Sequence, residues 1–134
     1  MVKNKFQIVM LILVLTFVSL ACGFSASTAN IKDAYLTLDE AGTEKTTVYS
    51  QDAVFYCIVQ LANAPDDTNL KAVWTAVDAE DTEPNFMIDD VSVTTGDAPV
   101  TFSLPNESLW PLGKYKVELF INDELKQTLD FEVQ

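Results

Sequence analysis

The sequence beyond its N-terminal segment predicts an all-β domain, built as a two-sheet sandwich of about seven strands. Three observations predict this fold class. Apolar and polar residues alternate over short stretches, turn-forming residues separate these stretches, and no sustained helical stripe follows the N-terminal segment. Residues 31–134 have an ordinary length for one domain, so we expect a single hydrophobic core.

The first expected strand covers residues 31–38 and places Ala34, Leu36 and Leu38 on one face. After a break rich in turn-forming residues, residues 46–49 form a short continuation on an edge. Residues 54–61 then alternate most strongly, with an inward set of Phe55, Cys57, Val59 and Leu61.

The middle of the domain contains three further strands. Residues 70–77 have an inward set of Leu70, Ala72, Trp74 and Ala76, so the tryptophan points into the core. Residues 86–94 and 99–104 follow, and residues 95–97 between them form an expected hairpin turn. Within the second of these two strands, one face carries Val100, Phe102 and Leu104.

The last two strands, residues 114–121 and 125–133, form an expected hairpin around residues 122–124. The first has an inward set of Tyr115, Val117, Leu119 and Ile121. For the second, the inward set is Leu125, Leu129, Phe131 and Val133.

Two features resemble the immunoglobulin superfamily. Cys57 precedes Trp74 by 17 residues, like the core cysteine and tryptophan of immunoglobulin domains, and Tyr115 lies in a Gly-Lys-Tyr-Lys-Val segment that is similar to the tyrosine corner. Val117 stands where the second cysteine would be, which removes the inter-sheet disulfide. The resemblance implies an immunoglobulin-like sandwich. A looser likeness, through this segment and residues 72–74, connects the chain with uncharacterised bacterial lipoproteins.

The N-terminal segment has the layout of an export signal. Lys3 and Lys5 precede an unbroken apolar run at residues 8–15, and Ala21 stands immediately before Cys22. Residues 19–22 resemble the lipobox of bacterial lipoprotein precursors, although the family prefers other residue types at the first two of these positions. The resemblance implies a signal peptide at residues 1–21, a diacylglycerol on Cys22, and a membrane anchor through that lipid.

Other fates of this segment remain open. Ser19 and Ala21 also suit an ordinary signal peptidase, which would give a secreted protein, and an uncleaved anchor would be helical if retained. All three alternatives place the domain outside the cytoplasm. Residues 22–30 are rich in small side chains and are expected to be a flexible tether.

The charge balance limits the partners that the domain can have. The chain has 8 Lys and Arg against 20 Asp and Glu, a net charge of −12, with no His. We expect no nucleic-acid binding, because a phosphate backbone is held by clusters of Lys and Arg. The acidic residues form either a solvated surface or a surface that attracts cationic ligands.

The thiols and carboxylates offer little catalytic chemistry. Cys57 lies in an apolar strand and is expected to be a buried core thiol, although a disulfide with Cys22 is possible if Cys22 is not acylated. With no His, neither a Ser-His-Asp nor a Cys-His arrangement can form, so we expect no enzyme and no cofactor. One acidic loop contains four carboxylates that are candidate calcium ligands, although their spacing does not match the Asp-x-Asp-x-Asp-Gly calcium-binding loop: Asp78, Glu80, Asp81 and Glu83.

The remaining candidates are aromatic contact residues. Trp110 lies in a connection and either contacts a ligand or caps the sandwich beside Leu104 and Tyr115. Tyr56 and Phe120 face outward by alternation and, with Ile58, could form an apolar patch. The sequence therefore predicts a membrane-anchored extracytoplasmic module that binds a protein, peptide or glycan. The alternative is a structural or accessory subunit of an envelope assembly, acting as an inhibitor or like a chaperone.

Overall fold

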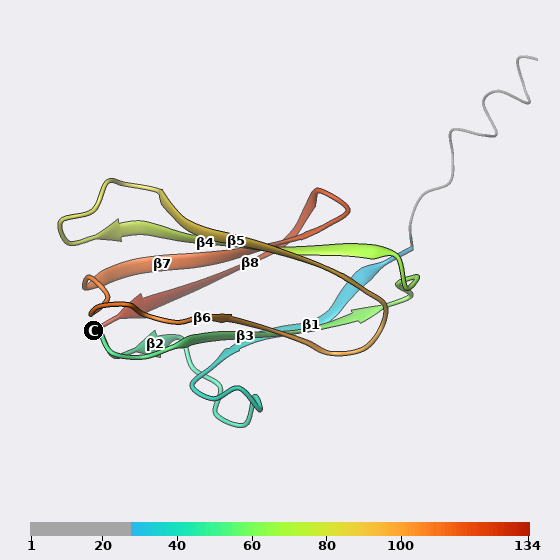
Figure 1. Ribbon diagram of the computed structural model, residues 1–134, viewed down its shortest axis with the longest axis horizontal. Coiled ribbons are helices and arrows are strands. Elements are labelled where there is room, and N and C mark those ends of the chain that lie inside the picture. The colour runs from blue at the N-terminus through green and yellow to red at the C-terminus, as the bar shows by residue number, and fades with distance from the viewer. Residues whose placement is uncertain (1–27) are drawn as a thin grey trace, which may run out of the picture.

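The computed structural model describes residues 28–134, which form two β-sheets packed face to face (Figure 1). The predicted signal peptide, Cys22 and residues 23–27 of the predicted tether lie outside the described residues. The strands are β1 (Asn30–Thr37), β2 (Val48–Tyr49), β3 (Phe55–Ala62), β4 (Thr68–Ala79), β5 (Phe86–Thr95), β6 (Val100–Leu104), β7 (Gly113–Ile121) and β8 (Glu124–Val133). Within residues 28–134 there is no helix that is long and apolar enough to span a membrane.

One sheet has three strands in the order β1-β3-β6, and the other has five in the order β2-β8-β7-β4-β5. All neighbouring strands are antiparallel except β2, which pairs in parallel with the end of β8. The chain therefore moves from one sheet to the other between β1 and β2. The predicted all-β sandwich is confirmed.

The core lies between the sheets and contains the predicted inward sets of β3, β4 and β7. Trp74 is fully buried, and its ring lies 6.2 Å from Phe55 and 6.1 Å from Phe131, measured between ring centroids. Its indole N–H has no hydrogen-bond partner in the part of the chain that the structure describes. Cys57 and Val117 are also fully buried, so the two positions whose sequence pattern resembles the cysteine pair of immunoglobulin domains hold core side chains without a disulfide.

The tyrosine corner is present at the start of β7. The Tyr115 hydroxyl donates a hydrogen bond of 2.6 Å to the carbonyl oxygen of Pro111, four residues upstream. Gly113 begins the strand with a φ of +150°, and a Cβ at this position would lie 2.2 Å from the carbonyl oxygen of Asp78. Only glycine fits this close approach of two backbones.

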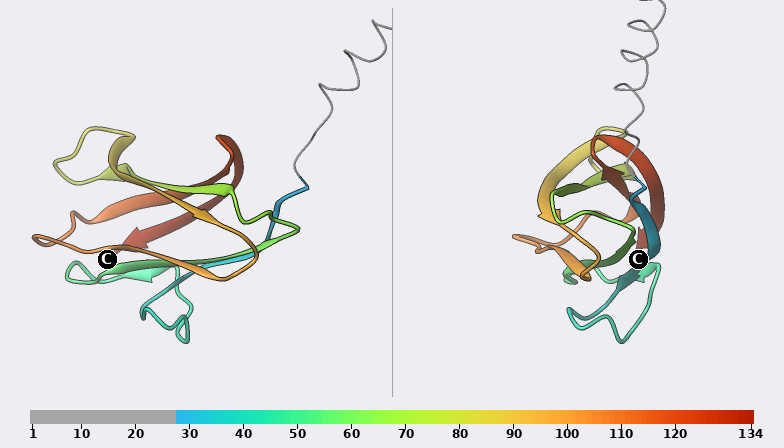
Figure 2. Two further views of the ribbon diagram at one scale, coloured as in Figure 1. Left: turned by 45° about the vertical axis from the view of Figure 1, so that its right-hand side comes forward. Right: turned by 90° about the vertical axis from the view of Figure 1, so that its right-hand side faces the viewer.

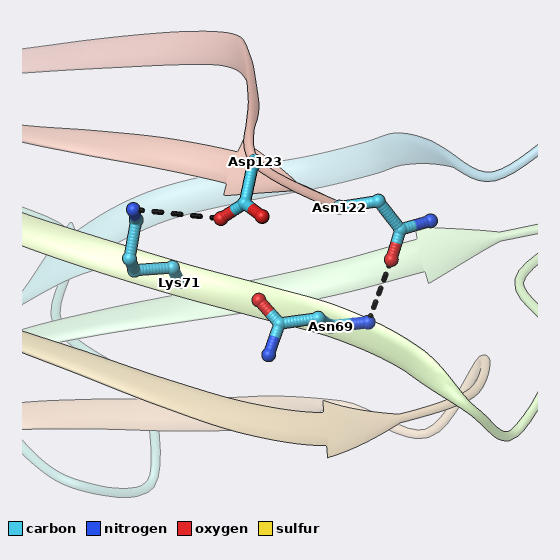
Figure 3. Close-up of polar contacts among 4 residues, drawn as sticks. All are labelled: Asn69, Lys71, Asn122 and Asp123. Atoms are coloured by element: carbon cyan, nitrogen blue, oxygen red, sulfur yellow. Dashed lines mark hydrogen bonds and ion pairs between the residues drawn. The ribbon is translucent and has the colours of Figure 1, made fainter.

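The predicted hairpin of β7 and β8 is confirmed. Its turn residues, Asn122 and Asp123, have φ values of 48° and 67°, as a two-residue turn with two left-handed positions requires. Asn122 also joins the turn to β4, since its N–H donates to the Asn69 carbonyl at 2.9 Å. In a second hydrogen bond, marked in Figure 3, its side-chain oxygen accepts the Asn69 N–H at 3.0 Å.

The expected hairpin between β5 and β6 is wrong. β5 pairs with β4 at the edge of the five-stranded sheet, whereas β6 pairs with β3 in the other sheet. The connection between them therefore crosses from one sheet to the other. Asp97 in this connection accepts the Ala64 N–H at 2.8 Å, which fixes the crossing against the loop that follows β3.

Leu125, which is predicted to face inward, and Leu38, which is predicted to share a face with Ala34 and Leu36, are both exposed. Leu125 is 48% exposed because a bulge between Leu119 and Phe120 shifts the register, so that Leu125 pairs with the outward-facing Phe120. Leu38 is 47% exposed because it follows the last residue of β1, where the chain leaves the sheet. The alternation of apolar and polar residues in the sequence does not show where the bulge lies or where the strand ends.

The sandwich has two distinct ends, which Figures 1 and 2 show at opposite sides of the molecule. The described chain enters at one of them, where Asn30 pairs with Ala62 and where the turn Asn122–Asp123 also lies; we call this the tether end. At the opposite end, which we call the far end, lie residues 50–54, 80–85 and 105–112.

Candidate functional site

A groove of about 470 Å³ opens at the far end, beside the β6–β7 connection. We call it the Trp110 groove; its lining residues are Ile88, Asp89, Leu104, Pro105, Glu107, Ser108, Leu109, Trp110 and Pro111. Its volume is within the range of about 300–1,000 Å³ that is typical of small-ligand sites. Six of the nine lining residues have apolar side chains, and the other three are Asp89, Glu107 and Ser108.

The groove is open because its two walls belong to different sheets. β5 is the edge strand of one sheet and β6 the edge strand of the other, so no backbone ladder joins them. β5 also contains a bulge, since Met87 pairs with Thr75 and Asp89 with Trp74, which leaves Ile88 as the extra residue. Ile88 packs against the core, and Asp89 remains exposed at the edge.

Trp110 is held rigidly in the wall of the groove. Its indole N–H donates to the Ala53 carbonyl at 2.8 Å, and its backbone N–H donates to the Gln51 carbonyl at 2.8 Å. The Gln51 side-chain amide in turn donates to the Trp110 carbonyl at 2.9 Å. The ring stacks on Phe55 with 4.5 Å between centroids. The side chain is only partly buried, so it offers a fixed aromatic surface.

The exposed part of the groove combines an apolar side chain with negative charge. Leu109 is 63% exposed, the largest exposure among the big apolar side chains of the described region. Asp89 accepts the N–H of Asp90 at 2.9 Å. Neither Asp89 nor Glu107 forms an ion pair in the described part of the chain, and the lining contains no lysine.

The chemistry of this groove suits binding. A ligand can bury apolar surface against the aromatic wall at about 25 cal/mol per Å² and place a positive charge near the carboxylates. The free thiol in the described part of the chain, Cys57, is not available to a ligand or as a nucleophile, because it is fully buried and burial raises its pKa to about 12. At neutral pH this thiol is protonated and inert.

The expected apolar patch of Tyr56, Ile58 and Phe120 is wrong, because the structure places its members on different sheets. Tyr56 and Ile58 belong to β3, whereas Phe120 belongs to β7 in the other sheet. Ile58 is buried at 8% exposure; a Cβ on Gly42 of the β1–β2 loop would lie 3.1 Å from it, so this loop covers it. Alternation predicts a face but cannot assign a strand to a sheet.

Phe120 is partly buried, and its ring is covered by a lysine. The Lys71 ammonium lies 4.7 Å from the ring centroid, and it also lies 3.7 Å from a carboxylate oxygen of Asp123 (Figure 3). Tyr56 is likewise partly buried, and its carbonyl accepts the Tyr49 hydroxyl at 3.2 Å. Binding roles for Tyr56 and Phe120 stay predictions, but neither lies in the Trp110 groove.

The acidic loop does not form a metal site in the structure. Three of the four calcium candidates lie around the β4–β5 connection with exposed side chains, Glu80, Asp81 and Glu83, and Asp78 is exposed near the end of β4. Among residues 28–134, no three acidic, cysteine or histidine side chains lie where they could hold a metal ion together.

The sequence points to Trp110 beside Leu104, and both residues line the groove, but it does not point to the other lining residues. The sequence places Ile88 and Asp89 in an expected strand, and no pattern in it marks Glu107 or Leu109 as a contact residue. The available signal was the segment 105–111, in which two prolines enclose an exposed leucine and a tryptophan. The position of β5 beside this segment could not be predicted, because the β5–β6 connection was expected to be a hairpin.

Comparisons with known proteins show the fold. No protein-family model and no curated protein sequence matches the chain. An immunoglobulin-like protein from Pseudomonas aeruginosa superposes with a TM-score of 0.54 at 17% identity, over 82% of this chain and 99% of that one. The C-terminal domain of wzt gives a TM-score of 0.51 at 14% identity, over 81% of this chain and 75% of that one.

A third similar structure is the alkylpurine DNA glycosylase AlkC of Pseudomonas fluorescens, bound to DNA that contains an abasic site analog. It superposes with a TM-score of 0.54 at 13% identity over 81% of this chain, which spans only 31% of that protein. Identities this low establish fold and not activity. The domain is an immunoglobulin-like β-sandwich.

Proposed function

We propose that this protein is an immunoglobulin-like binding module, anchored outside the cytoplasm by a lipid on Cys22, which holds its partner in the Trp110 groove. The observation that carries the proposal is the position of the groove. It lies at the far end of the sandwich, whereas β1 begins at the tether end. An anchor that precedes β1 therefore attaches the domain at the end opposite to the groove and leaves the groove accessible.

The geometry of Trp110 supports binding more than catalysis. Residues that contribute most to binding energy are enriched in tryptophan, and a preorganised ring loses little entropy when a partner docks. Hydrogen bonds to residues 51 and 53 and the stack on Phe55 provide this preorganisation. A non-catalytic role also agrees with the absence of histidine from the chain.

The anchor and the binding site are tested separately in cells. Metabolic labelling with a fatty acid should mark the wild-type chain and not the Cys22→Ala variant; a labelled variant would refute the anchor. A photoreactive residue at position 109 should cross-link a partner, and the same residue at position 125 is the control. Leu109 and Leu125 are both exposed leucines, at the far end and at the tether end. Cross-links from position 125 and none from position 109 would contradict the Trp110 groove as the site and would indicate binding at the outer face of the five-stranded sheet, near Phe120.

An accessory subunit completed by a strand of another chain is the second candidate, and the edge of β8 favours it. β2 pairs only with Glu132 and Val133, so residues 124–131 of β8 have β7 as their one paired neighbour among the described strands. A groove of about 420 Å³ between β1 and β8 lies beside this edge. Free strand edges can accept a strand from a partner. Coelution with one partner at a fixed stoichiometry, lost when proline replaces Thr128, would support this candidate.

A further inference from the structure

We infer that the Trp110 groove takes an extended polypeptide segment in which an apolar side chain stands next to lysine or arginine. This inference rests on the proposed function and names the class of partner. It follows from three observations: two carboxylates without ion pairs, an apolar lining, and an edge strand that cannot accept a ligand strand along its bulged part.

The first observation concerns charge. Asp89 and Glu107 line the groove without a lysine within 4.0 Å, in a chain whose net charge is −12. An apolar ligand that covered these carboxylates would remove water from them and give nothing in return, which is costly for a charged group. A cationic side chain offsets that cost and gains from the surrounding negative potential.

The second observation concerns shape and polarity. Besides Trp110, the apolar lining residues of the groove are two prolines and three aliphatic residues, Ile88, Leu104 and Leu109. The indole N–H is already bonded to the Ala53 carbonyl, so the ring has no donor left for a ligand. The polar lining residues, Asp89, Glu107 and Ser108, can bond only some hydroxyl groups of a sugar, and the six other lining residues leave the rest without a partner, whereas an aliphatic side chain needs only apolar contact. The lining therefore favours a peptide over a neutral glycan.

The third observation concerns β5, the strand at the groove. Free strand edges can bind peptides by adding a strand, but a bulge at Ile88 interrupts this one. Next to the bulge, the N–H of Asp90 is bonded to the Asp89 carboxylate at 2.9 Å. Bulges and edge charges are features that prevent strand pairing. The ligand is therefore held through its side chains.

A second copy of the chain does not fit as the occupant. Each copy carries 20 acidic residues against 8 lysines and no arginine, so two copies repel one another. A basic partner has the complementary charge. The occupant is thus a segment of a different, positively charged polypeptide.

Direct binding measurements test this inference. The full chain in detergent micelles is mixed with a fluorescein-labelled heptapeptide that has leucine between two lysines, and fluorescence anisotropy is recorded at low and high salt. Three probes are compared with it: the peptide with glutamate for lysine, the peptide with serine for leucine, and a neutral hexasaccharide. We expect measurable binding of the lysine–leucine peptide only, weakened at least about tenfold by salt that shortens the Debye length to a few Å.

Two double variants separate the groove from the general acidity of the chain. Asp89→Asn with Glu107→Gln should weaken peptide binding at least about tenfold, because both cation partners are lost. Asp66→Asn with Asp67→Asn, which changes charge equally in exposed residues at the tether end, should change it less than about twofold. Urea unfolding of each variant checks that the fold is intact.

The outcomes distinguish the inference from the proposed function. Failure of the lysine–leucine peptide to bind, equal binding of the glutamate peptide, preference for the hexasaccharide, or equal effects of the two double variants would each overturn the inference. A cross-link from position 109 would still support a binding groove in those cases. If neither the cross-link from position 109 nor peptide binding is observed, both the inference and the proposed function are overturned.

Discussion

The ring of Trp110 stacks on the ring of Phe55, with 4.5 Å between the centroids and 19° between the planes. Phe55 is fully buried and lies edge-on to Tyr115 and Phe131, at centroid distances of 5.8 Å and 4.8 Å. Trp110 thus connects the surface of the groove to the aromatic core. Stability and binding should respond differently to substitutions on the two sides of this stack.

Replacing Trp110 should destabilise the fold. Trp110→Ala removes the stack and leaves the Ala53 carbonyl without its donor, for an expected loss of about 2–3 kcal/mol, below the cost for a fully buried tryptophan. Trp110→Phe keeps a stacking ring and should cost about 1 kcal/mol. Urea denaturation gives both values. Leu109→Ala, a change at an exposed neighbour, should cost less than about 0.5 kcal/mol. Equal losses for Trp110→Ala and Leu109→Ala would contradict the structural role of the ring.

Removing the hydroxyl of Tyr115 tests the tyrosine corner. Tyr115→Phe keeps the buried ring and deletes the hydrogen bond to the Pro111 carbonyl, so unfolding should become easier by about 1 kcal/mol. Thermal unfolding followed by circular dichroism is a sufficient measurement. Because Pro111 lines the groove, the variant should also bind the lysine–leucine peptide more weakly. Unchanged stability would show that the hydrogen bond contributes nothing.

The turn between β7 and β8 depends on Asn122. Asn122→Ala loses the hydrogen bond to the Asn69 N–H and places alanine at a φ of 48°, so about 2 kcal/mol should be lost. Asn122→Gly loses the same hydrogen bond but adopts positive φ freely, and its cost should be about 1 kcal/mol smaller. Chemical denaturation of the two variants side by side separates the backbone effect from the hydrogen bond. A larger loss for glycine than for alanine would be inconsistent with this geometry.

Alkaline pH should destabilise the fold, in part through Cys57. Burial raises the pKa of this thiol from 9.0 to about 12, so the unfolded chain loses the proton first. The contribution of the thiol is complete below about pH 9 and is lost as the pH rises to about 12. Burial also raises the pKa of Tyr49 and Tyr115, which adds to the same trend.

The matched variant for this prediction is Cys57→Ala. At pH 8 the free energy of unfolding of the variant should be lower than that of the wild-type chain. Between about pH 9 and pH 11 it should fall less steeply with pH, and the two slopes should differ by up to about 1.4 kcal/mol per pH unit. Urea midpoints measured across this range supply the slopes. Identical slopes for the wild-type chain and the variant would mean that the thiol does not titrate as burial predicts.

The sequence predicted the parts of the fold that depend on local alternation and on side-chain type. The inward sets around Cys57, Trp74 and Val117 are buried, and the Tyr115 corner forms as its Gly-Lys-Tyr-Lys-Val segment indicates. These features follow from a period of two residues and from a motif with a known hydrogen bond. No long-range information was needed for them.

The remaining features depend on how distant segments meet. Ile88 and Leu109 are 21 positions apart and share one groove only because β5 and β6 are edges of different sheets. Leu125 is exposed because of a bulge that no residue type in the sequence predicts. Both outcomes are set by tertiary pairing, which a single sequence does not encode in any local pattern.

The most direct test of the claim that the Trp110 groove binds a partner is to measure how substitutions at the far end change the affinity for that partner. The partner captured by cross-linking at position 109 is purified, and its dissociation constant is measured for the full chain, for Leu109→Ser and for Leu125→Ser. Both variants replace an exposed leucine with the same residue, at opposite ends of the domain. We predict a loss of about tenfold or more for Leu109→Ser and less than about twofold for Leu125→Ser. Equal affinities for the two variants, or a larger loss for Leu125→Ser, would contradict the proposed site.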